Sequence, residues 1–122
     1  MNDAYNANPA SMRSALSNLP EPKKGGKKIA LLGTMKELGS FSVSEHAEIG
    51  RYAKEHVDYL LVLGEEAKPL FDCFYESKKE AEFFLDLQKA ALRLKEIARK
   101  GDAVLIKGSR SMNMETILDY FA

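Results

Sequence analysis

The stretch Ile29-Ala30-Leu31-Leu32-Gly33 decides the fold, because a short run of apolar residues ends at a glycine that opens a loop. Similar runs occupy residues 59–64 and 103–108, and a weaker one occupies residues 82–85. Strands that are apolar almost throughout are typical of a sheet covered by helices on both faces. Because longer segments of helical period alternate with these runs, the sequence predicts β-α-β units. We therefore expect a single α/β domain with a mostly parallel sheet.

Four segments before, between and after these runs carry helix signals. Asn8 is a good N-cap, and Pro9 suits the first position of a helix. Ser44 is placed to cap a second helix, whose small residues form one face that can pack closely on a sheet. Gly101 is placed to stop a third helix with an apolar face. The expected helices cover residues 9–18, 44–56, 86–100 and 114–121.

The composition excludes several classes of protein. With 18 Lys and Arg against 18 Asp and Glu, the formal net charge is zero, whereas a nucleic-acid binder normally carries excess basic charge on one face. Cys73 is the only cysteine, so no internal disulfide can form. No apolar run approaches the roughly 20 residues that cross a bilayer. We expect a cytoplasmic protein that binds neither nucleic acid nor membrane.

Two loops that follow strands carry the side chains best suited to ligand binding. They span residues 33–40 and 107–112, and ligands of doubly wound sheets collect at the carboxyl ends of strands. Lys107, Ser109 and Arg110 could hold a carboxylate or phosphate by charge-assisted hydrogen bonds. Polar residues around a glycine also form simple tight turns, so both interpretations stay open. Neither loop matches a dinucleotide fingerprint or a P-loop.

The N-terminal residues form a second polar group without an evident structural role. Asp3, Tyr5 and Asn6 place an acid, a phenol and a carboxamide close together. A carboxamide can read the donor and acceptor edge of a purine, and an acid suits ribose hydroxyls. These residues are therefore candidates for nucleotide binding.

Histidines do not indicate a metal site. His46 and His56 lie ten residues apart on one expected helix, so they do not face one another as paired ligands would. We predict no metal site. We expect His46 at a helix surface or an interdomain contact rather than in a catalytic role.

Three separated motifs stand out along the chain: residues 3–12, residues 32–39 followed by Ser44, His46 and Gly50, and residues 107–115. Together they resemble the C-terminal domain of MurF-type Mur ligases. Their order and their spread over essentially the whole chain make the resemblance specific. It implies a Rossmann-like three-layer sandwich in which residues 1–122 are one domain. It also implies a fragment of a longer ligase, whose central ATPase domain and N-terminal UDP-sugar domain are absent from this sequence.

The resemblance implies an activity for the complete enzyme. Ligases of this family add D-alanyl-D-alanine to UDP-N-acetylmuramoyl-tripeptide in bacterial peptidoglycan synthesis, with ATP and Mg²⁺ held mainly by the central domain. An acyl phosphate forms on the tripeptide carboxylate, and the dipeptide amine attacks it. The C-terminal domain closes over ATP and positions the dipeptide. We therefore expect part of an ATP-dependent carbon–nitrogen ligase, inactive alone because this sequence has no P-loop.

The resemblance also assigns residues by position. Those implied to contact the nucleotide are Asp3, Tyr5, Asn6, Asn8 and Pro9. Those implied on the dipeptide side are Lys107, Ser109 and Arg110. Glu37 and His46 match positions at the active-site edge or an interdomain contact, and no catalytic residue or metal ligand is assigned. The sequence departs from the family at Thr34, where an Asp is usual, which removes any role that depends on charge there.

One alternative from a different class stays open. The chain could be a stand-alone, non-catalytic Rossmann-like module that binds a nucleotide or small ligand. The start of the sequence two residues before Asp3 is what a cut at a domain boundary would give, and it favours the ligase fragment. A nicotinamide-dependent oxidoreductase would rest on fold alone, because the glycine fingerprint is missing.

Overall fold

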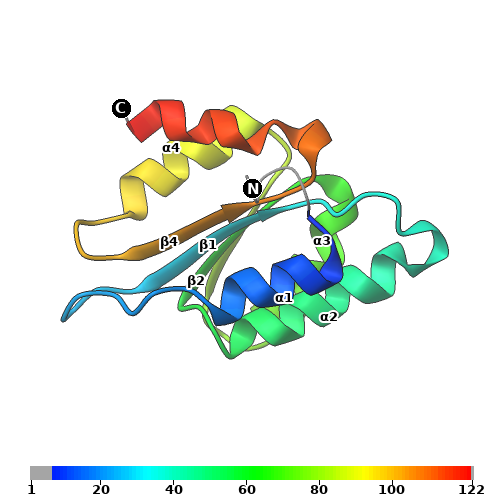
Figure 1. The fold of residues 1–122 in the computed structure, drawn as a ribbon, viewed down its shortest axis with the longest axis horizontal. Helices are drawn as coiled ribbons and strands as arrows, with labels where there is room; N and C mark the ends of the chain where they lie inside the picture. The colour runs from blue at the N-terminus through cyan, green and yellow to red at the C-terminus, as the bar shows by residue number, and fades with distance from the viewer. Residues whose placement is uncertain (1–6, 122) are drawn as a thin grey trace.

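Four parallel strands form the sheet at the centre of the molecule (Figure 1). The computed structural model describes residues 7–121. The strands are β1 (Lys28–Gly33), β2 (Tyr59–Leu63), β3 (Glu80–Phe84) and β4 (Ala103–Lys107), in the order β3-β2-β1-β4. All three neighbouring pairs are parallel. The predicted α/β fold is confirmed, and the weak fourth run is a true strand that begins two residues earlier than expected.

Helices cover both faces of this sheet, which makes the three layers that the sequence predicts (Figure 1). One layer holds α1 (Pro9–Ser17), α2 (Ser42–Lys54) and α3 (Lys68–Tyr75). The other holds α4 (Leu87–Ile97) and the 3-10 helix η5 (Met114–Phe121). The two inner strands are therefore buried on both faces, which explains their continuous apolar sequence.

Alternate residues of the inner strands belong to two separate cores. Side chains that pack with α1, α2 and α3 are Ala30, Leu32, Leu60 and Val62. Those that pack with α4 and η5 are Ile29, Leu31, Leu61 and Leu63. This alternation follows from the two-residue period of a strand.

The start of α1 follows the sequence prediction. The Asn8 side chain accepts a hydrogen bond from the Ser11 amide at 2.8 Å, and the Asn8 amide donates to Ser11 Oγ at 3.0 Å. This reciprocal capping box satisfies amides that a helix start leaves without partners. Pro9 occupies the first helical position, as predicted.

The start and the packing of α2 differ from the prediction. The helix begins at Ser42, and the Ser44 hydroxyl donates to the Phe41 carbonyl instead of capping the helix. A Cβ at Gly50 would lie 2.3 Å from the Leu70 carbonyl oxygen, so at this residue the close approach is to α3. Ala53 and Val57, also on the expected small face, belong to the core that includes strand side chains.

Two further helices depart from their expected form. Helix α4 begins after its N-cap Asp86 but ends at Ile97, three residues before the expected Lys100. The chain then turns through Gly101, which has a φ of +100°. Residues 114–121, expected as a helix with an apolar side, form the 3-10 helix η5, of which Met114 and Ile117 are buried.

Asp102 ties the loop after α4 to the start of β1. Its carboxylate accepts from the amides of Lys27 at 2.9 Å and Arg99 at 2.8 Å, and the Lys27 ammonium lies 3.6 Å away. Burial alone would raise the pKa of Asp102, but these two amides and the ammonium outweigh it and lower that pKa. Lys28 pairs with Glu21 in the same region, so the basic stretch of residues 19–28 includes paired charges.

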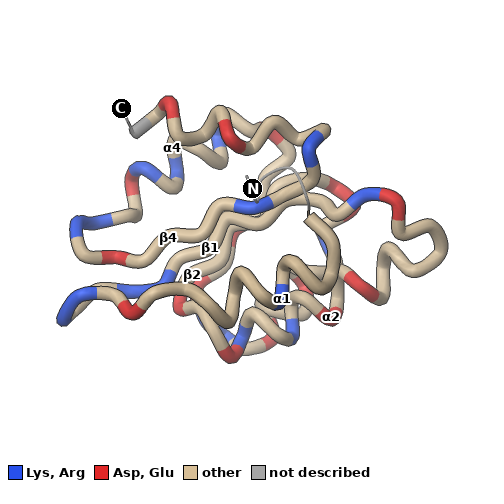
Figure 2. The backbone as a smooth tube through the Cα atoms, viewed as in Figure 1, with Lys and Arg blue, Asp and Glu red and all other residues tan. Residues whose placement is uncertain are grey.

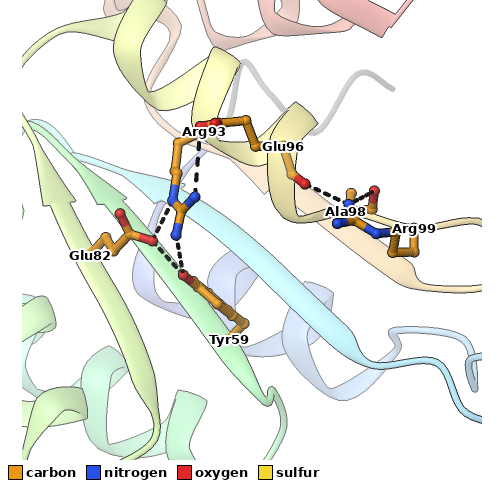
Figure 3. A network of polar contacts seen from close by, with 6 residues as sticks. All are labelled: Tyr59, Glu82, Arg93, Glu96, Ala98 and Arg99. Carbon is orange, nitrogen blue, oxygen red and sulfur yellow. Dashed lines mark hydrogen bonds and ion pairs between the residues drawn. The ribbon is translucent and has the colours of Figure 1, made fainter.

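A second polar network joins α4 to the sheet (Figure 3). Arg93 Nε donates to Glu82 Oε2 at 2.8 Å, and Arg93 Nη2 donates to the Tyr59 hydroxyl at 3.3 Å. The Tyr59 hydroxyl also donates to Glu82. Burial and the bond to Glu82 raise the pKa of Tyr59. Because Tyr59 is the first residue of β2, this network connects α4 to the sheet near the amino ends of the strands.

Charges of both signs are mixed along the chain (Figure 2). Within residues 7–121, no helix has the length and apolar character needed to cross a membrane.

Candidate functional site

A cleft of about 830 Å³ opens at the carboxyl ends of β1 and β4. Three segments that are distant in the sequence line it: the residues before α1, the loop after β1 and the loop after β4. The lining residues are Ala7, Asn8, Lys36, Glu37, Ser109, Arg110 and Ser111. Each of the three motifs that carry the resemblance therefore contributes to one cleft.

Sheet topology explains why the cleft lies here. From β1 the chain moves to β2 and then β3 on one side, whereas β4 returns to the other side of β1. The loops after β1 and β4 thus leave the sheet in opposite directions and open a crevice between them. Ligands of open α/β sheets bind at such a switch point.

Two glycines allow the loops to leave β1 and β4 close together. A Cβ on Gly33 would lie 2.4 Å from the sulfur of Met114, and a Cβ on Gly108 only 2.1 Å from it. The buried Met114 side chain therefore occupies the space that any other residue at these positions would fill. The Ser109 amide then donates to the Thr34 carbonyl at 2.9 Å, which fastens the two loops to each other.

Thr34 is 2% exposed and does not line the cleft. A Cβ at Gly64 would come within 2.4 Å of Thr34 Oγ1, so the side chain packs closely against the end of β2. At this position the chain holds a neutral hydroxyl in a buried setting.

The loop after β1 presents two opposite charges to the cleft. Both Lys36 and Glu37 are exposed. Lys36 Nζ pairs with Glu66 Oε1 at 2.6 Å, and Glu66 lies in the 3-10 helix η3 (Glu65–Ala67) after β2. Glu37 has a φ of +62°, in the left-handed region that a side chain disfavours. Strained residues of this kind concentrate at binding and catalytic sites.

His46 corrects an expectation, because it is fully buried rather than at a helix surface. Its Nε2 accepts from the Met35 amide at 2.9 Å, and its Nδ1 lies 2.7 Å from the Ser42 carbonyl oxygen. Burial is the main influence on the His46 pKa and lowers it. The surface prediction fails because both ring nitrogens serve backbone groups inside the domain. His46 therefore lies behind the cleft, next to the loop that carries Lys36.

The loop after β4 brings two of its three predicted side chains to the cleft. Ser109 and Arg110 line it, and Ser109 Oγ lies 2.9 Å from Ser111 Oγ. Lys107 is the last residue of β4, is 1% exposed and is not among the lining residues. Arg110 begins the 3-10 helix η4 (Arg110–Met112) and is exposed.

The predicted nucleotide residues are only partly described. Asn8 lines the cleft, while its Oδ1 is already occupied by the Ser11 amide. Pro9 begins α1 and is not among the lining residues. Asp3, Tyr5 and Asn6 lie outside the described residues.

Sequence reasoning missed Lys36, Ser111 and Ala7 as lining residues. Lys36 could have been found from its place next to Glu37 in the loop of residues 33–40. Ser111 could have been found from its place next to Arg110 in the loop of residues 107–112. Nothing in the residue type marked Ala7.

Chemically, the cleft can bind a small molecule that carries both charges. The guanidinium of Arg110 and the serine hydroxyls suit a carboxylate, while the Glu37 carboxylate suits an ammonium group. Within residues 7–121, no three His, Cys, Asp or Glu side chains come together in a way that could hold a metal ion.

Comparison with known proteins adds independent findings. Residues 1–110 match the family described as Mur ligase, glutamate ligase domain. The chain is 34% identical over 122 residues to a UDP-N-acetylmuramoyl-tripeptide–D-alanyl-D-alanine ligase of Bacillus subtilis, covering 97% of this chain and 26% of that enzyme.

Solved structures agree with this match. The structure of MurF ligase from Thermotoga maritima in complex with ADP superposes with a TM-score of 0.76 and 35% identity, over 99% of this chain and 27% of that one. MurF from Acinetobacter baumannii superposes with a TM-score of 0.79 and 29% identity, over 96% and 26%. The chain thus spans about a quarter of the length of the relatives it matches.

Proposed function

The chain belongs to the Mur ligase family, and from this premise we propose that it is the C-terminal domain of a ligase that adds D-alanyl-D-alanine to UDP-N-acetylmuramoyl-tripeptide. In this proposal the domain acts within a longer bacterial, cytoplasmic enzyme, beside a central ATPase domain and an N-terminal domain that binds the UDP-sugar. Ligases of this name and a MurF structure with ADP support both the substrates and the use of ATP.

The observation that carries the proposal is the convergence of three motifs on one cleft. Positive and negative side chains face the same space, as a zwitterionic dipeptide requires. Arg110 and Ser109 would hold the dipeptide carboxylate, and Glu37 would attract its ammonium group. Ala7 and Asn8 lie on another wall of the cleft.

The proposed contribution of this domain is positioning. Transfer of the terminal phosphoryl group of ATP to the tripeptide carboxylate would form an acyl phosphate and ADP. The dipeptide amine would then attack the acyl carbon, forming the amide bond while phosphate leaves. Holding the amine beside the acyl phosphate makes this step effectively intramolecular. Closure of the domain would exclude water that could hydrolyse the acyl phosphate.

The described residues do not fit a magnesium site, because no acidic cluster is present among them. We therefore assign Mg²⁺ and most ATP contacts to the proposed central domain. Asn8 could contribute to the nucleotide through its Nδ2, since its Oδ1 caps α1.

Steady-state kinetics of the intact ligase tests this division of labour. Arg110→Ala should raise the KM for D-alanyl-D-alanine by roughly 10- to 100-fold, since a charged hydrogen bond is worth about 1.5–3 kcal/mol. The KM for ATP should change much less. Asp3→Ala should show the reverse pattern.

Lys24→Ala supplies the control, because Lys24 is an exposed cation in the loop before β1, at the amino end of the sheet. It should leave both KM values unchanged. Equal effects of Arg110→Ala on the two substrates would refute the proposed roles.

A further inference from the structure

We infer that His46 is a positioning residue: as a neutral imidazole with its proton on Nδ1, it holds the loop after β1 in the conformation that presents Lys36 and Glu37 to the cleft. The inference rests on the proposed function only for the identity of the ligand. The hydrogen bonds that carry it belong to the domain alone.

The loop is fastened at two consecutive residues as it leaves the sheet. The Thr34 carbonyl accepts from the Ser109 amide at 2.9 Å, and the Met35 amide donates to His46 Nε2 at 2.9 Å. The Met35 side chain is fully buried. Lys36 and Glu37 follow directly, so these two hydrogen bonds fix the backbone from which both charged side chains extend.

Only one protonation state of His46 fits its surroundings. The Ser42 carbonyl, 2.7 Å from Nδ1, can only accept, so Nδ1 must carry a proton. The Met35 amide can only donate, so Nε2 must present its lone pair. A proton on Nε2 would set two donors against each other and break the link to Met35. The imidazolium and the other neutral tautomer are therefore incompatible with this loop conformation.

The two charged neighbours of His46 act on its protonation in opposite directions. Glu66, in η3, favours the charged imidazole, whereas Lys36, in the loop itself, disfavours it. These two side chains form an ion pair with each other at 2.6 Å. Burial is the largest influence and keeps the pKa of His46 below its ordinary value. The neutral form should therefore persist at neutral pH.

Other roles for His46 are less consistent with its geometry. A catalytic residue touches the reacting groups, and His46 is fully buried and does not line the cleft. The bond to Met35 joins α2 to the loop across 11 residues of sequence, which a purely local helix contact would not do.

The direct test is NMR of the 122-residue chain labelled uniformly with nitrogen-15. At neutral pH we expect a scalar coupling across the hydrogen bond between the Met35 nitrogen and His46 Nε2, together with ring shifts of the Nδ1–H tautomer. On acidification, loss of the coupling and movement of the Lys36 and Glu37 amide resonances should follow the titration of His46. No coupling at neutral pH, or the Nε2–H tautomer, would overturn the inference.

Two variants separate positioning from general stability. His46→Asn can keep a donor near the Nδ1 position but has no acceptor for Met35, whereas His46→Gln can place an acceptor near the Nε2 position. Hydrogen exchange at the Met35 amide should be at least tenfold faster in His46→Asn, with a much smaller change at Leu61 in the central sheet. His46→Gln should restore part of the protection. Equal loss at Met35 and Leu61 would mean a merely structural role.

In the intact ligase, His46→Asn should raise the KM for the dipeptide and His46→Gln should recover part of it. If Arg110→Ala leaves that KM unchanged, the proposed ligand is wrong, but the NMR result on Met35 still decides the role of His46. The two failures are therefore distinguishable.

Discussion

At the scale of single residues, Glu37 combines an unfavourable backbone conformation with a position at the cleft. Its φ of +62° costs a non-glycine residue on the order of 1 kcal/mol, and the loop keeps that conformation. Lys78 has a similar φ of +65° in the turn after α3, which does not line the cleft. Because Glu37 and Lys78 share this backbone conformation but only Glu37 lines the cleft, substitutions at the two positions separate the effect of backbone strain from that of ligand binding.

Glu37→Gly should therefore stabilise the chain by about 1 kcal/mol in chemical denaturation, because glycine adopts positive φ without strain. Lys78→Gly should give a similar gain. In the ligase, only Glu37→Gly should raise the KM for the dipeptide. A loss of stability in Glu37→Gly would contradict the backbone strain, and an equal effect of both variants on the KM for the dipeptide would contradict the proposed role of the carboxylate.

The pH dependence of stability tests the buried state of His46. Because its folded-state pKa lies below the ordinary value of 6.5, the unfolded chain binds more protons in the acid range. The contribution of neutral His46 to the free energy of unfolding is complete above pH 6.5, and it falls as the pH drops through the folded-state pKa. Unfolding free energies measured from neutral to acid pH should show this decline.

His46→Gln should flatten the decline below pH 6.5. His56→Gln serves as the control, because His56 is only half-buried and stacks on Tyr52 at 4.4 Å between ring centroids. It should leave the decline in place. The same slope in the wild type and His46→Gln would show that His46 does not govern it.

Single residues are also where sequence reasoning is least informative. Ser109 and Arg110 could be predicted because they follow a strand at the edge of the sheet where ligands collect, whereas Glu37 and Asn8 were site candidates only through the resemblance to Mur ligases. The burial of His46 could not, because it depends on where the loop after β1 returns to α2. A residue's type does not state which face of its helix will be covered.

At the scale of elements, the contact between α2 and α3 depends on one glycine. A Cβ at Gly50 would overlap the Leu70 carbonyl at 2.3 Å, an approach that flexible side chains cannot relieve because the partner is backbone. For Gly50→Ala, helix propensity therefore predicts a higher free energy of unfolding, whereas packing predicts a lower one.

Gly50→Ala should destabilise the chain by about 1–3 kcal/mol, as overpacking does. Propensity alone would stabilise it by about 1 kcal/mol. Glu48→Ala, at an exposed position of the same helix, should stay within about 0.5 kcal/mol of the wild type. Chemical denaturation measures all three, and a stabilised Gly50→Ala would refute the close packing of α2 on α3.

The strands and most helix positions could be predicted because their signals are local. Asn8 caps α1 and Asp86 caps α4 through side-chain oxygens that the sequence already displays. The start of α2 was missed, because the 3-10 turn η2 (Gly39–Phe41) leads directly into the helix without a side-chain cap. Ser44, two residues after the true start of the helix, was misleading because serine is a common N-cap residue.

At the scale of the whole molecule, the sequence predicted a parallel sheet but could not give the strand order. Local patterns identify strands, whereas their neighbours depend on how the crossovers pack. The order β3-β2-β1-β4 is what creates the switch point and brings loops 70 residues apart to one cleft. The cleft lies beside β1 and β4, whose following segments lead to opposite layers of the molecule, and this position agrees with the proposed binding of a small, doubly charged ligand.

ADP release tests the central claim most directly, measured in parallel for the purified 122-residue chain and for the native protein isolated with an antibody against these residues. The chain alone should release none above a blank without protein. The native protein should be several times larger than 13.6 kDa and should release ADP only when UDP-N-acetylmuramoyl-tripeptide and D-alanyl-D-alanine are both present. A native protein of 13.6 kDa that releases no ADP would contradict the ligase account and favour a stand-alone binding module.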